Sequence, residues 1–259
     1  MAIADSAAPR FEMGRVAKRT FSVIGSNIVT LSVLSPLAGI PYLAVAWNSE
    51  QFDLGLRDGQ FDSNALLFLA VSWFVYMIGM FIQQASITHA TVAYLNRRPA
   101  SVADCLATGF SSVLHLILIA VLLFLALIPS MLLLVIPAIM LMIMWFVAIP
   151  ACVVERTGVL GAFSRSRELT RGYRWPIFGL YVVFVVLMIL IAVVAGAVIG
   201  VGVFAASGGA AISSVQIAVQ TVATMISSTV ISTLIASIYY ELRQIKEGIG
   251  PEALASVFD

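Results

Sequence analysis

Residues 175–240 read WPIFGLYVVFVVLMILIAVVAGAVIGVGVFAASGGAAISSVQIAVQTVATMISSTVISTLIASIYY, and none of these 66 residues is Asp, Glu, Lys or Arg. A second uncharged stretch covers the 50 residues 105–154, and a third covers 64–96. The hydrocarbon core of a bilayer is about 30 Å thick and requires about 20 apolar residues per helix. The sequence therefore predicts an all-α polytopic membrane protein.

The composition supports the same class. Hydrophobic residues make up 61% of the 259 residues and charged residues 10%, whereas soluble domains contain about 25% charged residues. The net charge of +1 gives no indication of nucleic-acid binding. Cys105 and Cys152 show no C-x-x-C spacing, so we expect neither a zinc site nor a redox site. The N-terminal segment lacks the apolar core of a cleaved signal peptide, so we expect a retained anchor.

The uncharged stretches and the turn residues between them divide the chain into six predicted spans. Pro129-Ser130 and Ser207-Gly208-Gly209 are expected to be the turns between paired spans. Three hairpins should then form a single integral membrane domain, each introduced by an amphipathic interfacial helix, near Gly25, Gly109 and Gly172. The spans lie near 28–47, 64–90, 111–128, 131–153, 176–203 and 213–238.

The expected segments of this domain, 1–259, are an N-terminal tail with an interfacial helix (1–27), hairpins 28–98 and 99–156, an elbow helix with the third hairpin (157–243), and a cytoplasmic tail (244–259). Thirteen of the fourteen Lys and Arg residues fall on one side of this arrangement, and Arg57 is the exception. The positive-inside rule assigns that side to the cytoplasm. Both termini are therefore predicted to be cytoplasmic.

The predicted elbow helix, residues 158–172, is rich in arginine. Helical periodicity places Val159, Leu160, Phe163 and Leu169 mostly on one face, which we expect to lie at the headgroup boundary. Two interpretations of the arginines remain open: they recognise anionic lipid headgroups or a partner's acidic surface, or they only fix the topology. The candidate binding residues are Arg156, Arg165, Arg167, Arg171 and Arg174.

Uncharged polar residues recur within two of the spans. In the sixth span they are every fourth residue, and in the second they crowd one half. Lipid-exposed amides are costly, so these side chains should form interhelical hydrogen bonds or line a polar cavity for a lipid headgroup or small solute. The candidate bundle face consists of Gln216, Gln220, Thr224 and Ser228; the second span carries Gln83, Gln84, Ser86, Thr88 and Thr91.

Small residues form a ridge on the fifth span, at Ala192, Gly196 and Gly200. Such a ridge permits close helix approach, either within the chain or in a dimer, and we favour internal packing. Within the spans the ionisable groups that could support catalysis are His89 and His115, and no carboxylate lies within a helical turn of either. No catalytic or nucleotide-binding motif is present. We therefore expect no enzyme, no catalytic, metal or cofactor-binding residue, and no cofactor.

Two segments resemble a known family: IPACVVERTGVLGAFSRSRELTRGYRWPIFGL (149–180) and YYELRQIKEG (239–248). They are similar to the bacterial integral membrane family named for the membrane domain of glycerophosphoryl diester phosphodiesterases. The resemblance implies a six-span bacterial inner-membrane module in a lipid-related process. Only eleven residues follow Gly248, so the soluble phosphodiesterase domain of some relatives, and its activity, are not expected here. The matching positions are Pro150, Glu155, Ala162, Arg165, Ser166, Leu169, Gly172, Trp175, Tyr240, Leu242, Arg243, Lys246, Glu247 and Gly248.

The two segments should meet at the inner interface. There we predict a structural charge cluster of Glu155, Glu241, Arg165 and Arg243 that joins the helix ends, the alternative being independent solvated charges. We expect a structural or regulatory module in membrane or lipid homeostasis, or a subunit of a membrane complex. The alternative is a transporter-like permease subunit for a lipid or small solute, coupled to a separate ATPase through residues 99–109 or 157–172. Expected partners are anionic lipids on the cytoplasmic side and membrane proteins or further copies of the chain, but no nucleic acid.

Overall fold

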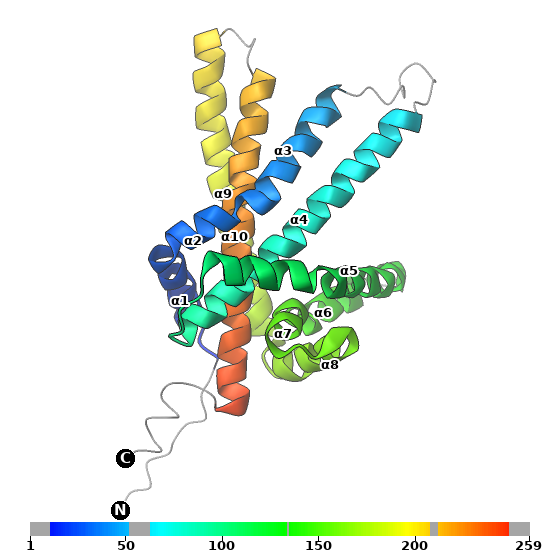
Figure 1. Ribbon diagram of the computed structural model, residues 1–259, viewed down its shortest axis with the longest axis vertical. Helices are drawn as coiled ribbons and strands as arrows, with labels where there is room; N and C mark the ends of the chain where they lie inside the picture. The colour runs from blue at the N-terminus through cyan, green and yellow to red at the C-terminus, as the bar shows by residue number, and fades with distance from the viewer. Residues whose placement is uncertain (1–10, 52–62, 134, 208–211, 249–259) are drawn as a thin grey trace, which may run out of the picture.

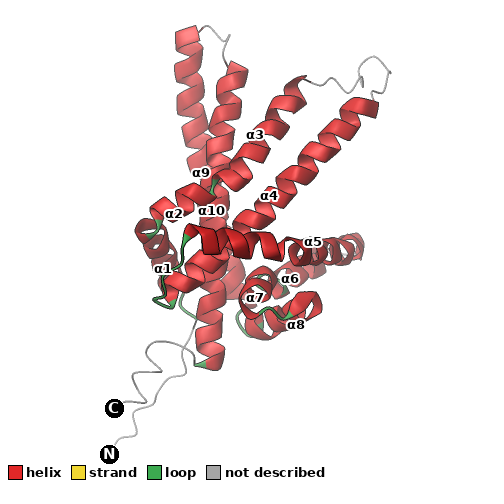
Figure 2. Ribbon diagram, viewed as in Figure 1, coloured by secondary structure: helices red, strands yellow, loops and turns green. Residues whose placement is uncertain are grey.

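The computed structural model describes residues 11–51, 63–133, 135–207 and 212–248. Within these ranges the regular structure is helical and contains no strand (Figure 2). Six segments are long and apolar enough to cross a membrane, which confirms the predicted class of multi-pass membrane protein. The helices are α1 (Met13–Ser26), α2 (Ile28–Leu34), α3 (Pro36–Gln51), α4 (Ser63–Leu95), α5 (Val102–Leu133), α6 (Val135–Met144), α7 (Ala148–Glu155), α8 (Gly158–Thr170), α9 (Arg174–Ser207) and α10 (Ile212–Glu247).

The spans pair as three hairpins: α2 and α3 with α4, α5 with α6 and α7, and α9 with α10 (Figure 1). The first span is divided because Pro36 begins α3, a position where its missing N–H costs nothing. The expected turn at Pro129-Ser130 is wrong, since α5 continues through both residues to Leu133. The expected start of a tail at residue 244 also falls inside a helix, because α10 extends to Glu247.

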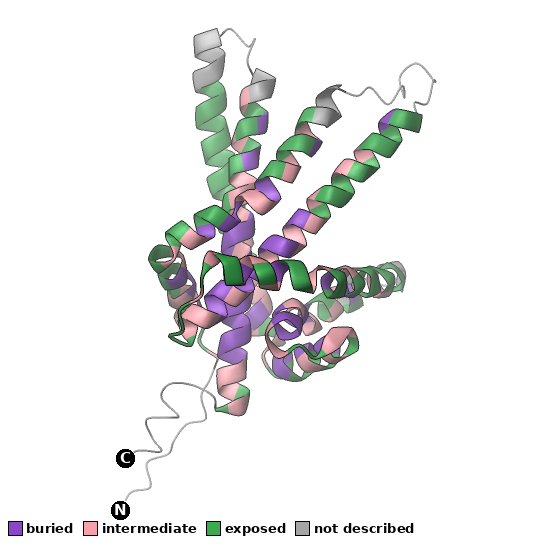
Figure 3. Cartoon of the chain, viewed as in Figure 1, coloured by how far each residue is buried: buried purple, intermediate pink, exposed green. Residues whose placement is uncertain are grey.

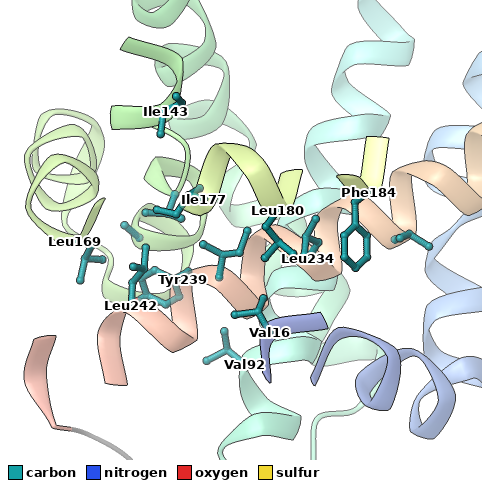
Figure 4. Packing of buried hydrophobic residues seen from close by; sticks show 14 residues of the cluster. Val16, Val92, Ile143, Leu169, Ile177, Leu180, Phe184, Leu234, Tyr239 and Leu242 are labelled. Carbon is teal, nitrogen blue, oxygen red and sulfur yellow. The ribbon is translucent and has the colours of Figure 1, made fainter. Parts of the chain in front are cut away.

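Helix α10 lies at the centre of the molecule, in contact with α1, α3, α4, α7, α8 and α9. The largest hydrophobic cluster forms around it (Figure 4). Leu234, Ile238 and Tyr239 of α10 pack there against Val16 of α1 and Leu180 of α9. One helix thus gathers residues from both ends of the sequence into a shared core.

Two glycines bring α3, α4 and α5 close together. A Cβ atom at Gly79 would lie directly against the backbone carbonyl oxygen of Leu37, so α4 and α3 approach each other at this point. A Cβ at Gly109 would meet Ser86 and the carbonyl oxygen of Ile82, which brings α5 against α4 in the same way. These positions require glycine because there is no room for a side chain.

Only two of the three expected interfacial helices exist as separate elements, α1 and α8. The segment around Gly109 is instead part of α5. A capping box begins that helix: the Asp104 N–H donates to the Ser101 hydroxyl at 3.1 Å, and the Ser101 N–H donates to the Asp104 carboxylate at 3.2 Å. Between α8 and α9, by contrast, Gly172 takes a positive φ of 94° and permits a break.

The far halves of the hairpins separate from one another. In Figure 1 the tips of α3–α4 and α9–α10 diverge, and α5 leaves the centre in a third direction. Large apolar side chains are exposed along these halves, particularly on α4, α5 and α9, whereas the buried residues gather where the hairpins meet (Figure 3). Soluble proteins rarely expose such extended apolar surfaces, and acyl chains would cover them in a bilayer.

Candidate functional site

The charged side chains gather where the hairpins meet. Helices α1 and α8, the turn between α4 and α5, and the C-terminal part of α10 all lie there (Figure 1). We call this region the charged end of the molecule. Its acidic and basic residues form two buried or half-buried ion-pair clusters and leave a set of exposed arginines.

The first cluster, the Arg165 cluster, joins α7, α8 and α10. Glu155, the last residue of α7, accepts hydrogen bonds from Nε of Arg165 at 2.8 and 3.1 Å and from the hydroxyl of Tyr239 at 2.7 Å. Arg165 also contacts Glu168 at 3.3 Å and forms an ion pair with Glu247. Partial burial would lower the pKa of the Arg165 guanidinium, but the hydrogen bonds and charges of Glu155 and Glu168 outweigh it and raise the pKa.

The second cluster, the Glu241 cluster, joins α1 to α10. The Glu241 side chain is only 1% exposed, and it pairs with Nε of Arg15 at 2.9 Å and with Nη1 of Arg19. The Arg19 guanidinium also lies 5.4 Å from the ring centroid of Tyr240. An unpaired charge at this degree of burial is strongly unfavourable, so the two arginines hold α1 in place on α10.

The four residues of the predicted cluster therefore belong to two groups. Glu155 and Arg165 lie together, Glu241 pairs with α1, and Arg243 contacts Glu247 at 2.8 Å. Successive residues of a helix are about 100° apart, so Tyr239, Arg243 and Glu247 share one face of α10 while Glu241 lies on the opposite face. This spacing was visible in the sequence. The participation of Arg15 and Arg19 was not, because it depends on where α1 packs.

Three of the exposed arginines at the charged end lie on or beside α8. Arg167 lies on the outer face of α8, Arg171 follows the last residue of that helix, and Arg156 follows α7 in a left-handed conformation with φ of 51°. Among the residues that the structure describes, none of the three forms an ion pair. Arg174 begins α9 and is partly exposed, with a buried Nε that has no hydrogen-bond partner in the described ranges. Of the five predicted binding residues, Arg165 is the one that forms ion pairs with other described residues.

The apolar face of α8 packs inside the protein, which contradicts the expectation from the sequence that it lies at the headgroup boundary. Phe163 packs in the core formed by α4, α5 and α7, and Leu169 packs in the core around α10. Leu160 was assigned to the same face but is 77% exposed, on the side that carries Arg167. The protein itself thus buries the apolar face of α8, and the outward face combines arginines with one large apolar side chain.

Most of the polar residues of α4 are buried among the helices that pack against it. Gln83 donates from Nε2 to the Thr229 hydroxyl at 3.2 Å, which is an interhelical hydrogen bond of the expected kind. Ser86, Thr88 and Thr91 are also buried, and their hydroxyls have no hydrogen-bond partner within the described part of the chain. Gln84 is half-buried.

The predicted polar face of α10 is divided between two environments. Residues four apart on a helix differ in direction by about 40°. The three steps from Gln216 to Ser228 therefore rotate the side-chain direction by about 120°. Ser228 is consequently buried, and its hydroxyl bonds to the Met225 carbonyl at 3.2 Å. The other three line a groove of about 750 Å³ between α9 and α10, together with the small residues of α9. The groove lining includes Ala192, Gly196, Gly200, Gln216, Gln220 and Thr224.

The small-residue ridge of α9 does not pack within the chain, contrary to the interpretation favoured from the sequence. Ideal Cβ atoms at Gly196 and Gly200 would meet nothing within 4 Å among the described residues. The glycines that do provide close approach are Gly79 and Gly109, on other helices. The ridge instead forms the open floor of the α9–α10 groove.

The remaining candidate residues do not come together as a catalytic or metal-binding site within the described ranges. His89 is half-buried and His115 is exposed, while Cys105 and Cys152 are buried free thiols. No group of three His, Cys, Asp or Glu side chains is placed there to hold a metal ion. Residues 102–109 of the proposed coupling segment form the first turns of α5.

No protein-family model, no curated protein and no solved structure matches this chain.

Proposed function

We propose that this protein is a non-catalytic membrane module that binds anionic lipid headgroups through the exposed arginines beside α8, as a structural or regulatory component of membrane or lipid homeostasis. The observation that carries the proposal is the pair Arg167 and Arg171. They are four residues apart and hence on one side of α8, exposed and without an ion pair in the described chain. Arg156 extends the same positive surface at the other end of the helix.

The carboxylates at the charged end leave this surface positive. Glu155, Glu241 and Glu247 are all engaged with arginines of the two clusters. Glu168 is the exposed acid on α8, and it faces Arg165. Near an anionic leaflet each exposed cation contributes about 1 kcal/mol of attraction. Exposed Leu160 and Trp175 flank the arginines and would anchor the same surface at the membrane interface.

The rigid attachment of α8 is part of the proposed mechanism. The Arg165 cluster fixes α8 to α7 and α10, so the arginine positions do not depend on the lipid. A preformed site avoids the ordering cost that a mobile basic tail would incur on binding. The positive-inside rule supports an orientation with the charged end and both termini in the cytoplasm. The resemblance noted above supports a bacterial inner membrane as the location.

Native mass spectrometry of the detergent-purified protein tests this proposal. We expect phosphatidylglycerol to remain bound in preference to phosphatidylcholine, and the substitutions Arg167→Glu and Arg171→Glu together to remove that preference. Loss of two attractions of about 1 kcal/mol each predicts that the affinity for phosphatidylglycerol falls about thirtyfold. The matched control is Arg97→Glu with Arg98→Glu, which makes the same change in net charge on the exposed α4–α5 turn.

An equal loss in both double variants would show that only net charge matters and would contradict a site on α8. The alternative is a permease subunit whose α8 docks a separate ATPase. Co-purification of an ATPase that is lost on the α8 substitutions, with lipid binding unchanged, would favour that alternative.

A further inference from the structure

We infer that the groove between α9 and α10 binds one acyl chain of an ester-linked bilayer lipid, with its ester carbonyl at the amides of Gln216 and Gln220. This site lies in the half of the molecule away from the charged end. It requires no charge on the lipid, so it goes beyond the headgroup recognition proposed above.

The groove is an open site with a floor that lacks side chains. Its volume of about 750 Å³ falls within the range of about 300–1,000 Å³ found for small-molecule sites. Gly196 and Gly200 leave space where any other residue would place a side chain, and nothing in the described chain fills it. The walls are mostly apolar side chains, including Met188, Ile199 and Val219. Such a surface suits a hydrocarbon chain.

The two side-chain amides of the groove lie towards one end of it. Gln216 and Gln220 are exposed there, and their side chains make no hydrogen bond within the described residues. In an apolar environment an amide N–H without a partner is costly, so these donors select a ligand with an acceptor. An ester carbonyl provides an acceptor and no competing donor.

The position of these amides along α10 matches the depth of lipid ester groups. Gln220 lies 21 residues before Glu241, which corresponds to about 32 Å along the helix axis. The hydrocarbon core is about 30 Å thick. With Glu241 at one interface, Gln216 and Gln220 reach the opposite interface, where the ester groups of that leaflet lie. An acyl chain would extend from there past Thr224.

The length of the groove suits a hydrocarbon chain. Its α10 wall runs from Val215 to Ile231, which is about 24 Å along the helix axis. One leaflet of the hydrocarbon core is about 15 Å deep, so a single acyl chain that starts at the amides can lie along this wall.

Photo-crosslinking of the full-length protein in phosphatidylcholine nanodiscs tests the inference. The probe is a phosphatidylcholine that carries a diazirine in one acyl chain, and adducts are mapped by mass spectrometry. We expect adducts concentrated on groove residues such as Ala223 and Ser227. Gly196→Leu with Gly200→Leu should fill the groove and reduce these adducts at least fivefold. Val194→Leu with Val198→Leu, on exposed positions outside the groove lining, is the matched control and should have no effect.

A second comparison tests the role of the amides. We expect the ester-linked probe to label the wild-type groove several times more than an ether-linked analogue, and Gln216→Leu with Gln220→Leu to abolish the difference. Adducts spread evenly over the exposed apolar surface, and unchanged by the glycine substitutions, would overturn the inference. So would a wild-type dimer that these substitutions convert to a monomer, since the groove would then be an interface between copies. Because phosphatidylcholine is zwitterionic, neither result depends on the arginines of α8.

Discussion

Single side chains of α10 determine which neighbouring helix each of its faces contacts. Glu241 and Arg243 are two positions apart and lie on opposite faces, so one binds α1 and the other contacts Glu247 beside α8. The two arginine partners of Glu241 are less buried than Glu241 itself. Arg15 and Arg19 are 35% and 22% exposed, whereas Glu241 is 1% exposed. Removing the acid and removing the arginines should therefore have different consequences.

We predict that Arg15→Ala with Arg19→Ala destabilises the protein more than Glu241→Ala. The double substitution leaves a buried carboxylate without its arginine partners, at a cost of about 3–5 kcal/mol. After Glu241→Ala the arginines can turn towards water, so the cost should be about half of that or less. Thermal unfolding in detergent measures both, with Arg97→Ala and Arg98→Ala as the exposed control. Equal destabilisation by the acid and arginine substitutions would contradict the burial argument.

Glycines provide a second test at this scale. We predict that Gly79→Ala destabilises the protein by about 1–3 kcal/mol, because its Cβ would press against the Leu37 carbonyl and force α3 and α4 apart. Gly196→Ala should leave the melting temperature unchanged or raise it, since its Cβ enters open space and alanine favours the helix. A matched pair of melting curves decides the question. If Gly196→Ala were the more damaging change, the ridge of α9 would have to pack against something.

At the scale of elements, α8 is held by polar contacts at one edge and apolar contacts along its inner face. Phe163 and Leu169 enter two different cores, and Arg165 reaches both Glu155 of α7 and Glu247 of α10. The helix therefore connects the second hairpin to the third. Its exposed arginines keep a fixed position relative to the spans.

Double-mutant cycles should show this arrangement directly. We predict a coupling free energy of about 1–3 kcal/mol between Glu155→Gln and Arg165→Gln, which are in contact. Coupling between Glu155→Gln and Arg243→Gln should be smaller, because Arg243 pairs with Glu247, and Glu247 pairs with Arg165, the partner of Glu155. Unfolding free energies of the single and double variants give both values. The reverse order would mean that Arg243, and not Arg165, is the main partner of Glu155.

At the scale of the whole molecule, the packed and charged end contrasts with diverging apolar hairpins. Buried residues concentrate where α10 meets its neighbours, and the far halves expose apolar side chains (Figure 3). Apolar cores and ion pairs therefore hold the hairpins together at one end, and lipid is expected to fill the space at the other. The groove between α9 and α10 belongs to this open half.

The topology gives a prediction for the complete chain. Ser164→Cys on α8 and Ser63→Cys at the start of α4 are exposed, whereas the native Cys105 and Cys152 are buried and should react slowly. In intact cells a membrane-impermeant maleimide should label residue 63 and not residue 164, and the order should reverse in inside-out vesicles. Labelling of residue 164 from outside would place the arginines of α8 on the wrong side for the proposed function.

The sequence alone determined the class of protein, the number of spans and the side on which the cations gather. These properties follow from the lengths of uncharged stretches measured against a bilayer of fixed thickness, which is a property of the chain in one dimension. Of the three interfacial helices expected from the sequence, α1 and α8 are present, and the segment around Gly109 is part of α5. The error at Pro129 arose because a proline can lie inside a long helix when packing and the surrounding lipid favour continuation.

Only the tertiary structure decided which charges meet and which surfaces stay open. Arg19 and Glu241 are 222 residues apart in the sequence, and their pairing depends on how α1 is rotated against α10. The same is true of the small ridge of α9, which suits close packing in sequence but faces an empty groove in space. Periodicity specifies a helical face. The direction of that face follows from the packing of all the other helices, because each buried surface must find a complementary one.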